Sequence, residues 1–182
     1  GIASPRGVVQ GQKPNPVLSR LLLHESQVED FSGQRLPFAA VATDIVTGEA
    51  VVHESGDLAT ALRASMSNPG VFEPIEMDGR LLVDGFVSNN IPIDLALARD
   101  VDVVIAVNVG DPPLERDELT SSLAILGQAM SILTLRLDEQ QIAQLRPHDL
   151  LLVPDLEGYG APDFERGAEI VPKGRQIAEA AV

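Results

Sequence analysis

The sequence predicts an α/β fold with a mostly parallel central sheet. Short apolar runs that suit buried strands alternate with segments in which apolar residues recur every three or four positions, as on the buried face of a helix. Strands that alternate with helices favour a layered architecture with parallel strands. The length of 182 residues and the hydrophobic fraction of 45% are typical of one globular domain, which we expect to span residues 1–182.

Five segments are predicted as strands. Leu36–Asp44 is an almost continuous apolar run, and the turn pair Thr47-Gly48 predicts a hairpin that joins it to Glu49–Glu54. The other predicted strands are Arg80–Asp84, Val101–Gly110 and Asp149–Asp155.

Five segments are predicted as helices, and two of them carry clear signals at their ends. Asp57 is placed to cap a helix over residues 58–67, which must end before Pro69. Pro92 stands where a further helix begins, with Asp94 in its first turn, and this helix runs to about residue 99. The remaining predicted helices span about residues 17–22, 119–145 and 164–182.

The composition excludes several classes of function. The formal net charge of -14 repels phosphate backbones, so nucleic acid is not an expected partner. No apolar run approaches the roughly 20 residues that a membrane-spanning helix needs, and the N-terminal residues lack the apolar core of a signal peptide. The absence of cysteine excludes disulfides, thiolate catalysis and Cys-based metal sites.

Asp84 is the first candidate for a catalytic residue. It follows the apolar run Leu81–Val83, so a strand delivers its carboxylate to the rim of the sheet, where α/β proteins gather their chemistry. Gly85 lets the backbone turn sharply there. A carboxylate in such a place can act as a general base toward a hydroxyl group. The alternative is an ordinary Asp-Gly turn without a catalytic role.

The segment Ala64–Ala96 favours the catalytic interpretation, because it resembles the patatin-like phospholipase family in one continuous stretch. The family pattern is a helix ending in A-S-x-A-x-P, then x-x-F-x-P, a short hairpin, the motif D-G-[GA], an Asn-rich loop and N-x-P-x-x-x-A. The residues that fit are Ala64, Ser65, Pro69, Phe72, Pro74, Asp84, Gly85, Asn89, Asn90, Pro92 and Ala96. The runs Leu36–Val52 and Val101–Pro113 match as well, so the resemblance covers nearly the whole chain and is greatest to bacterial members.

The resemblance implies a three-layer α/β/α fold, here incomplete at its N-terminal side, and a lipid acyl hydrolase that acts on phospholipids or other acyl esters. Family chemistry uses a Ser–Asp dyad and needs neither histidine nor calcium, so no cofactor and no metal are expected. Asp84 corresponds to the aspartate of the dyad. We expect Gly85, Asn89 and Asn90 to support the loop that carries it.

Two features depart from the family pattern. No G-x-S-x-G elbow and no Gly-rich oxyanion loop occur in these residues, so we expect the chain to supply the aspartate but no nucleophile, and not to hydrolyse esters by itself. Position 86 is Phe, where the family has Gly or Ala. We assign Phe86, with Pro69 and Phe72, to a substrate groove that the added ring would narrow. The alternative is a non-catalytic lipid-binding or interaction module of the same fold.

Other candidate side chains favour structural roles. Ser65 and Ser67 lie near the end of a predicted helix, where the dipole disfavours an alkoxide, so packing or capping explains them better than nucleophilic catalysis. His24, His53 and His148 are scattered and lack metal-ligand spacing. A nucleotide-binding α/β domain is a weak alternative, because the sequence lacks both G-x-G-x-x-G and G-x-x-x-x-G-K-[ST].

The absent elbow has a consequence for folding. In the family, the first strand and the elbow helix belong to the middle of the sheet, so without them a central strand would expose its edge and apolar surface. We expect that surface to be covered by the missing N-terminal segment or by a second copy of the chain. The sequence leaves the compartment open between the bacterial cytoplasm and secretion.

Overall fold

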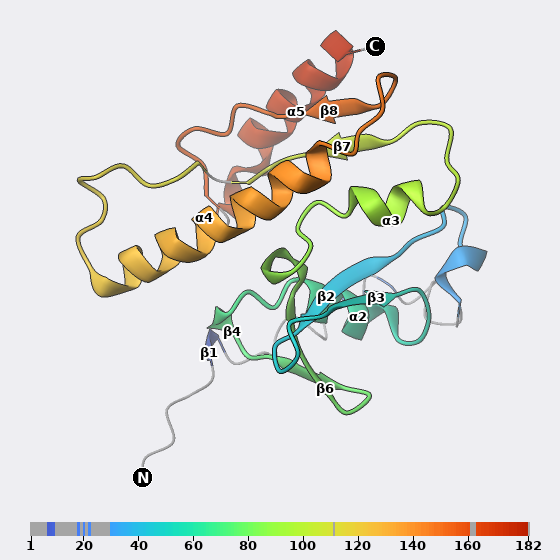
Figure 1. Cartoon of the computed structure of the whole chain (residues 1–182), viewed down its shortest axis with the longest axis horizontal. Coiled ribbons are helices and arrows are strands. Elements are labelled where there is room, and N and C mark those ends of the chain that lie inside the picture. The colour runs from blue at the N-terminus through green and yellow to red at the C-terminus, as the bar shows by residue number, and fades with distance from the viewer. Residues whose placement is uncertain are drawn as a thin grey trace. The chain divides into compact units, whose positions relative to one another are not determined.

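The structure, a computed structural model, describes residues 7–9, 18, 20, 22, 30–110, 112–160 and 163–181. It combines helices and strands, which confirms the predicted α/β class (Figure 1). The chain forms two compact units, residues 1–90 and residues 91–182, which we call unit 1 and unit 2. That residues 1–182 make one domain stays a prediction. Only residues 18, 20 and 22 of the predicted helix at residues 17–22 lie within the described part of the chain.

The predicted elements that lie in the described part occur in the expected order. Unit 1 contains β1 (Gly7–Val9), β2 (Ala40–Asp44), β3 (Ala50–His53), α2 (Leu58–Ser65), β4 (Gly70–Phe72), β5 (Ile75–Met77) and β6 (Arg80–Asp84), with 3₁₀ turns at Phe31–Gly33 and Gly85–Val87. Unit 2 contains α3 (Ile93–Leu97), β7 (Ile105–Val107), α4 (Ser122–Ile142), β8 (Leu150–Leu152), a 3₁₀ turn at Phe164–Arg166 and α5 (Gly167–Ala181). The structure adds the short strands β1, β4 and β5, and β5 forms with β6 the short hairpin that the family pattern contains.

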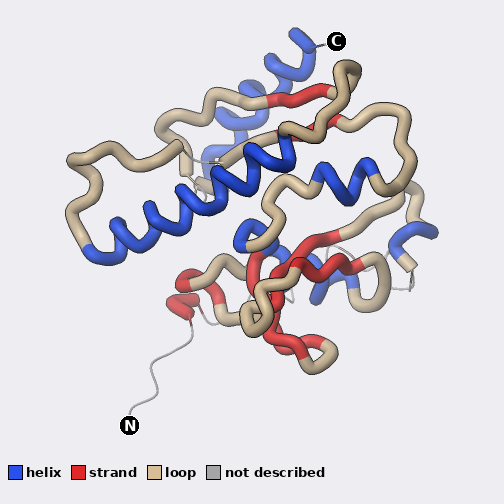
Figure 2. Tube along the Cα trace, in the orientation of Figure 1, coloured by secondary structure: helices blue, strands red, loops and turns tan. Residues whose placement is uncertain are grey.

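A four-stranded sheet in the order β3-β2-β6-β5 forms the centre of unit 1 (Figure 2). Its pairings are all antiparallel, whereas β1–β4 and β7–β8 pair in parallel. The four-stranded sheet therefore differs from the mostly parallel sheet that the sequence predicts. For the β2–β3 and β5–β6 pairings the reason is that a tight turn joins the two strands, and a tight turn connects only antiparallel neighbours. Asp78 and Gly79 both take positive φ, 51° and 74°, as a two-residue hairpin turn requires.

The helix α2 packs on this sheet and supplies much of the core of unit 1. Asp57 caps it as predicted, because its side chain accepts a hydrogen bond of 2.7 Å from the Thr60 N–H. The small buried side chains of α2 let the helix approach β2 and β6 closely. Two apolar clusters result, one of Phe31, Ala40, Leu58 and Ala61 and the other of Ala42, Ala64 and Leu82. Burial of a side chain such as Leu82 stabilises the fold by about 1.5–3 kcal/mol.

The strand β7 in unit 2 is shorter than the predicted Val101–Gly110, because β8 offers only Leu150–Leu152 as its partner. Side chains alternate along this run. Val104 and Ala106 are buried, and the large exposed side chains are Val103, Ile105, Val107 and Val109. A parallel pair of strands normally has both faces covered. The exposed apolar face agrees with the expectation of uncovered surface, and the identity of its cover stays a prediction.

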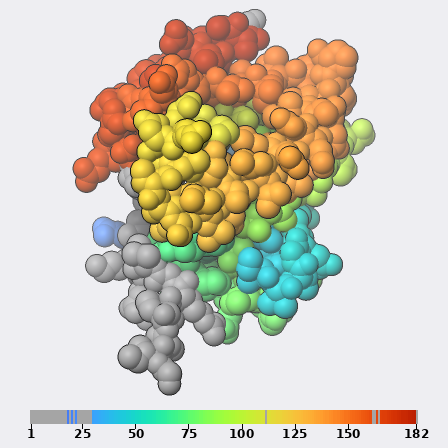
Figure 3. Space-filling view, turned by 60° about the vertical axis from the view of Figure 1, so that its left-hand side comes forward, coloured from blue at the N-terminus to red at the C-terminus, as the bar shows by residue number. Residues whose placement is uncertain are grey.

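The helices α3 and α4 border a small core in unit 2 that contains Ile91, Ile93 and Ala106. α4 and the loop before it lie on the surface in Figure 3, and Leu123, Ile125 and Leu126 of α4 are exposed. α4 has 21 residues. Within the described ranges, no helix is both long enough and apolar enough to cross a membrane.

Asp149 organises the turn between α4 and β8. Its side chain is 0% exposed, and its carboxylate accepts hydrogen bonds from the Val104 N–H at 2.8 Å and the Arg146 N–H at 2.7 Å. The Arg146 guanidinium adds two more bonds, each of 2.9 Å. These donors, the Arg146 side chain first among them, hold the pKa of Asp149 well below its ordinary value of 3.8. A buried carboxylate therefore joins β8 to β7.

We predict that unit 2 loses stability as Asp149 is protonated. A lowered carboxyl pKa contributes stability that is present above the unfolded value of 3.8 and is lost as pH falls through the lower folded value. In urea unfolding at pH 5, Asp149→Asn should have a lower free energy of unfolding than the unsubstituted chain. Between pH 5 and pH 2, the free energy of unfolding should decline less in Asp149→Asn than in the unsubstituted chain. The exposed Asp155→Asn serves as control. Equal pH dependence in Asp149→Asn and the unsubstituted chain would refute the assignment.

Candidate active site

Asp84 lies at the carboxyl end of β6, where the strand gives way to the 3₁₀ turn Gly85–Val87. Its side chain is half-buried and caps that turn, since Oδ1 accepts a hydrogen bond of 3.1 Å from the Phe86 N–H. Within the described residues, the second carboxylate oxygen has no hydrogen-bond donor. One carboxylate oxygen of Asp84 is thus hydrogen-bonded to the backbone, and the other is available to accept a hydrogen bond.

The backbone of Asp84 is held on both sides. Its N–H donates to the Ser67 carbonyl at 3.0 Å, and its carbonyl accepts from the Thr43 hydroxyl at 3.0 Å. The β2–β6 register sets Ala42 opposite Asp84. Because the backbone is fixed by β2 and by the segment after α2, the carboxylate projects from a rigid corner.

Burial raises the pKa of Asp84 above the ordinary value of 3.8, because a half-buried carboxylate loses hydration. The hydrogen bond from the Phe86 N–H acts in the opposite direction and is the smaller influence. A carboxylate with a raised pKa is a stronger base than a free one, and such groups cluster at functional sites. The local electrostatics therefore suit proton transfer.

Gly85 is required by close packing at this corner. A Cβ built on it would lie 2.6 Å from the Val41 carbonyl oxygen, which is backbone and cannot swing away. The Gly85 carbonyl also accepts from the Ser88 N–H at 3.1 Å and the Asn89 N–H at 2.8 Å. Of the two asparagines predicted to support the loop together with Gly85, Asn89 is buried and Asn90 is exposed. The backbone bond from Asn89 to Gly85 closes the loop, and the support that the two asparagine side chains give it stays a prediction.

Arg63 anchors the segment that follows α2. Although charged, it is 0% exposed, and its Nη1 donates to the Ser67 hydroxyl at 2.5 Å. Ser67 in turn donates to the Arg63 carbonyl at 2.6 Å, so it has a structural role rather than that of a free hydroxyl. The guanidinium also lies 4.8 Å from the centre of the Phe72 ring. Burial lowers the pKa of Arg63, and the charge of Glu73 opposes that shift.

The predicted groove residues share partial burial. Pro69 forms an isolated β-bridge with Phe72, whose ring packs on Arg63. Phe86 is half-buried and follows Asp84 by two residues. The structure thus links Pro69 and Phe72 to the segment that holds the Asp84 backbone. Their contact with a substrate stays a prediction.

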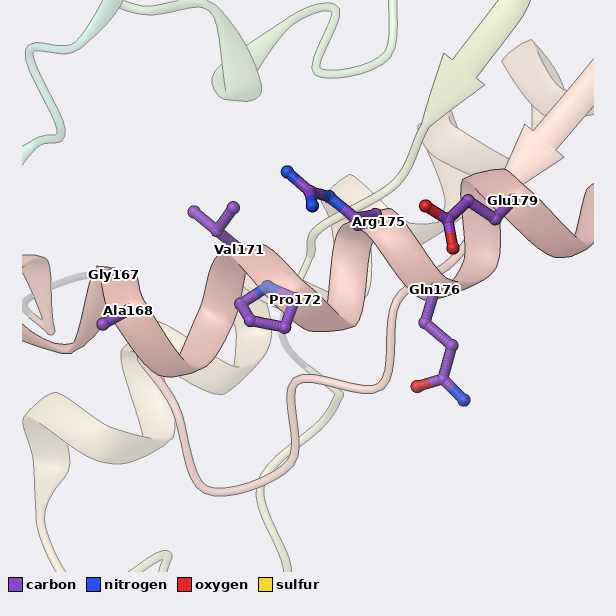
Figure 4. A pocket seen from close by; sticks show the side chains of 7 residues that line it. All are labelled: Gly167, Ala168, Val171, Pro172, Arg175, Gln176 and Glu179. Carbon is purple, nitrogen blue, oxygen red and sulfur yellow. The ribbon is translucent and has the colours of Figure 1, made fainter.

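A groove of about 540 Å³ lies elsewhere, along α5 in unit 2 (Figure 4). Its lining consists of α5 residues, including Val171, Pro172 and Arg175, and none of the predicted site residues. The side chains project from one helix, so the groove lacks converging groups from several elements that an active site needs. We do not assign chemistry to it.

The histidines have separate environments. His53 is buried on β3, and its pKa is lowered chiefly by burial. His148 is exposed and lies 4.0 Å from Asp149, and His24 falls outside the described residues. Over the described ranges, none of the interactions of Asp84 involves a histidine. The same ranges contain no group of three His, Cys, Asp or Glu side chains that could hold a metal ion.

Sequence reasoning missed Thr43, Ser88 and Arg63. Two of these residues could have been recognised from the sequence. Thr43 is a polar residue in the apolar run AVATD, and Arg63 is a charged residue in the Ala-rich segment of α2. A polar side chain at a buried position generally has a specific partner. Ser88 carried no such signal, because its loop is rich in polar residues.

The stretch that contains this site matches a known family. Residues 9–97 match the model of the patatin-like phospholipase family. Over these residues the chain is similar to that family. Asp84, Gly85 and the segment after α2 all lie inside the matched range.

Three relatives are similar to parts of this chain. An uncharacterized NTE family protein of Mycobacterium tuberculosis is 42% identical over 74 residues, which are 41% of this chain and 21% of that protein. Patatin-like phospholipase domain-containing protein 7 of Mus musculus is 39% identical over 112 residues, 60% of this chain and 8% of that protein. A second uncharacterized NTE family protein of M. tuberculosis is 28% identical over 166 residues, 80% of this chain and 28% of that protein. The chain therefore spans less than a third of each relative.

We predict that Gly85→Ala destabilises unit 1 by about 1–3 kcal/mol, the usual cost of forcing an extra methyl group into packed structure. The clash is with the Val41 backbone, so the corner that carries Asp84 must shift. Gly33→Ala is the matched control, because a Cβ there meets nothing within 4 Å. Urea unfolding measures both variants. Equal free energies of unfolding for the two would contradict the close approach at Gly85.

We also predict that Asp84→Asn is more stable than the unsubstituted chain at pH 7. A raised carboxyl pKa means that its stabilising contribution is complete below 3.8 and is lost as pH rises through the higher folded value. Asparagine carries no charge, and its Oδ1 still accepts from the Phe86 N–H. Unfolding free energies of the two proteins should converge below pH 3.8. A destabilised Asp84→Asn at pH 7 would contradict burial as the cause of the shift.

Proposed function

We propose that Asp84 is the general base of a Ser–Asp dyad in a lipid acyl hydrolase. The observation that carries the proposal is a half-buried carboxylate with a raised pKa, held at the end of β6, with one oxygen uncommitted among the described residues. The similarity of residues 9–97 to the patatin-like phospholipase family supports a lipid ester as the substrate. Asp84 lies within that matched range.

In the proposed reaction, Asp84 accepts the proton of a serine hydroxyl as the serine oxygen attacks the ester carbonyl carbon. The tetrahedral intermediate collapses, the bond to the alcohol oxygen breaks, and Asp84 returns the proton to the leaving alcohol. Asp84 then accepts a proton from water while the water oxygen attacks the acyl-serine. Collapse releases the fatty acid and restores the serine with that proton.

The two oxygens of Asp84 have separate tasks in this proposal. Oδ1 stays bonded to the Phe86 N–H and fixes the orientation of the carboxyl group. The other oxygen takes and returns each proton. Because the carboxylate does not rotate between the two half-reactions, the same geometry serves the attack by serine and the attack by water.

The nucleophile and the oxyanion donors would come from outside these 182 residues, since no G-x-S-x-G motif occurs in them. The contribution proposed for this chain is the base and the frame that holds it. Gly85 and Asn89 belong to that frame, and Phe86, Pro69 and Phe72 are proposed to line the acyl groove.

The net charge of -14 narrows the proposed substrate class. A strongly acidic protein repels anionic headgroups over the range of a Debye length. Neutral and zwitterionic esters are therefore favoured over anionic phospholipids.

We predict that Asp84→Asn lowers the rate of ester hydrolysis by about 10²–10⁴-fold, the contribution typical of a general base. The rate should be measured with a p-nitrophenyl acyl ester and with phosphatidylcholine vesicles, using the full-length product of the reading frame that encodes these residues. The matched control is Asp44→Asn, because buried Asp44 also ends a strand and accepts from a nearby N–H, that of Val46 at 3.0 Å. Equal rates for Asp84→Asn and Asp44→Asn would overturn the proposal.

A further inference from the structure

Thr43 places a hydroxyl group inside the core of unit 1. Thr43 is 0% exposed. It lies on the inner strand β2, where it pairs with Val83 of β6 on one side and with Ala50 of β3 on the other. Valine has nearly the same shape and would suit a buried strand position better. A buried hydroxyl there is costly unless it is hydrogen-bonded, so its partners indicate its role.

The hydrogen-bond partners of Thr43 flank the 3₁₀ turn Gly85–Val87, one before it and one after it. The Thr43 hydroxyl donates to the Asp84 carbonyl at 3.0 Å and lies 2.8 Å from the Ser88 hydroxyl oxygen. A threonine hydroxyl has a single proton. Because that proton is used on Asp84, Ser88 must be the donor in the second bond. The hydrogen bonds therefore run in one direction, from Ser88 to Thr43 to the Asp84 carbonyl.

The hydrogen bonds from Ser88 to Thr43 and from Thr43 to the Asp84 carbonyl, which we call the relay, fix the backbone where β6 meets the 3₁₀ turn. Asp84 precedes the turn and Ser88 follows it, so one side chain on β2 ties both ends of Gly85–Val87 to the sheet. The Ser88 N–H also closes the turn by donating to the Gly85 carbonyl at 3.1 Å. The direction of the Asp84 side chain depends on the backbone angles at this corner, φ -49° and ψ 140°.

We propose that Thr43, acting with Ser88, is a positioning residue that holds the Asp84 carboxylate in its half-buried place. The inference deepens the proposed dyad and rests on it for its functional meaning. Thr43 touches the backbone of Asp84 and not the reacting oxygen, so it acts through Asp84.

A purely structural role for Thr43 makes a different prediction. If the hydroxyl only satisfied the core, Thr43→Val would change the free energy of unfolding and leave the environment of the Asp84 carboxyl unaltered. If the hydroxyl positions Asp84, its loss lets the corner relax and the carboxylate gain water. The pKa of Asp84 then falls toward its ordinary value of 3.8.

The test is a ¹³C NMR titration of the Asp84 carboxyl in the 182-residue chain. Asp84→Asn assigns the signal by its disappearance. We expect the pKa of Asp84 to fall in Thr43→Val and to be restored in Thr43→Ser, which keeps the hydroxyl. The half-buried Thr60 on α2 gives the matched control Thr60→Val, which should leave the titration unchanged. An Asp84 titration in Thr43→Val that matches the Thr60→Val control would overturn the inference.

Ser88→Ala keeps the inference testable if Thr43→Val does not fold. It removes only the outer donor of the relay, so the pKa of Asp84 should fall in the same direction and by less. An unaltered titration in a folded Ser88→Ala would then count against the relay. The pKa titration does not depend on ester hydrolysis, so the two proposals can fail separately. An unaltered titration would overturn the positioning role of Thr43 and leave the dyad untouched. An unaltered rate of hydrolysis in Asp84→Asn would overturn the dyad and leave the positioning role untouched.

Discussion

The antiparallel pairing of β2 with β6 is the constraint on which the site depends. It sets Ala42 opposite Asp84 and brings the next residue of β2, Thr43, within hydrogen-bonding distance of the Asp84 carbonyl. The residue after Asp84 must be glycine, because a Cβ at position 85 would clash with the Val41 carbonyl oxygen. If the register shifted by one residue, inward and outward side chains would exchange faces and this corner could not form.

A second set of contacts holds the corner from the side of α2. Arg63 is buried with its charge and anchors Ser67, and the Ser67 carbonyl receives the Asp84 N–H. A buried cation costs stability unless its bonds are well made. Arg63 also packs against the Phe72 ring, so one side chain organises both the support of Asp84 and the segment to which Phe72 belongs. Buried polar side chains of β2 and α2 thus hold the backbone of Asp84, directly through Thr43 and indirectly through Arg63.

Sequence reasoning singled out Asp84, Gly85, Asn89 and Asn90 from motif spacing, and their roles stay predictions. It also found α2 and its Asp57 cap, since capping is a local property of the chain. It did not find that the four-stranded sheet is antiparallel, although the turn at Asp78-Gly79 contains the pair that favours a tight hairpin. Thr43 and Ser88 were missed for a different reason. They are 45 residues apart in the sequence, and only the folded sheet brings their hydroxyls together.

The fold holds the Asp84 carboxyl half-buried, as the proposed role of a base requires. The most direct test is the ¹³C-detected titration of the Asp84 carboxyl in the unsubstituted chain, read against the ordinary aspartate value of 3.8. We expect a midpoint above that value, because burial outweighs the hydrogen bond from Phe86. A midpoint at or below 3.8 would contradict the burial of the Asp84 carboxyl as the dominant influence on its pKa.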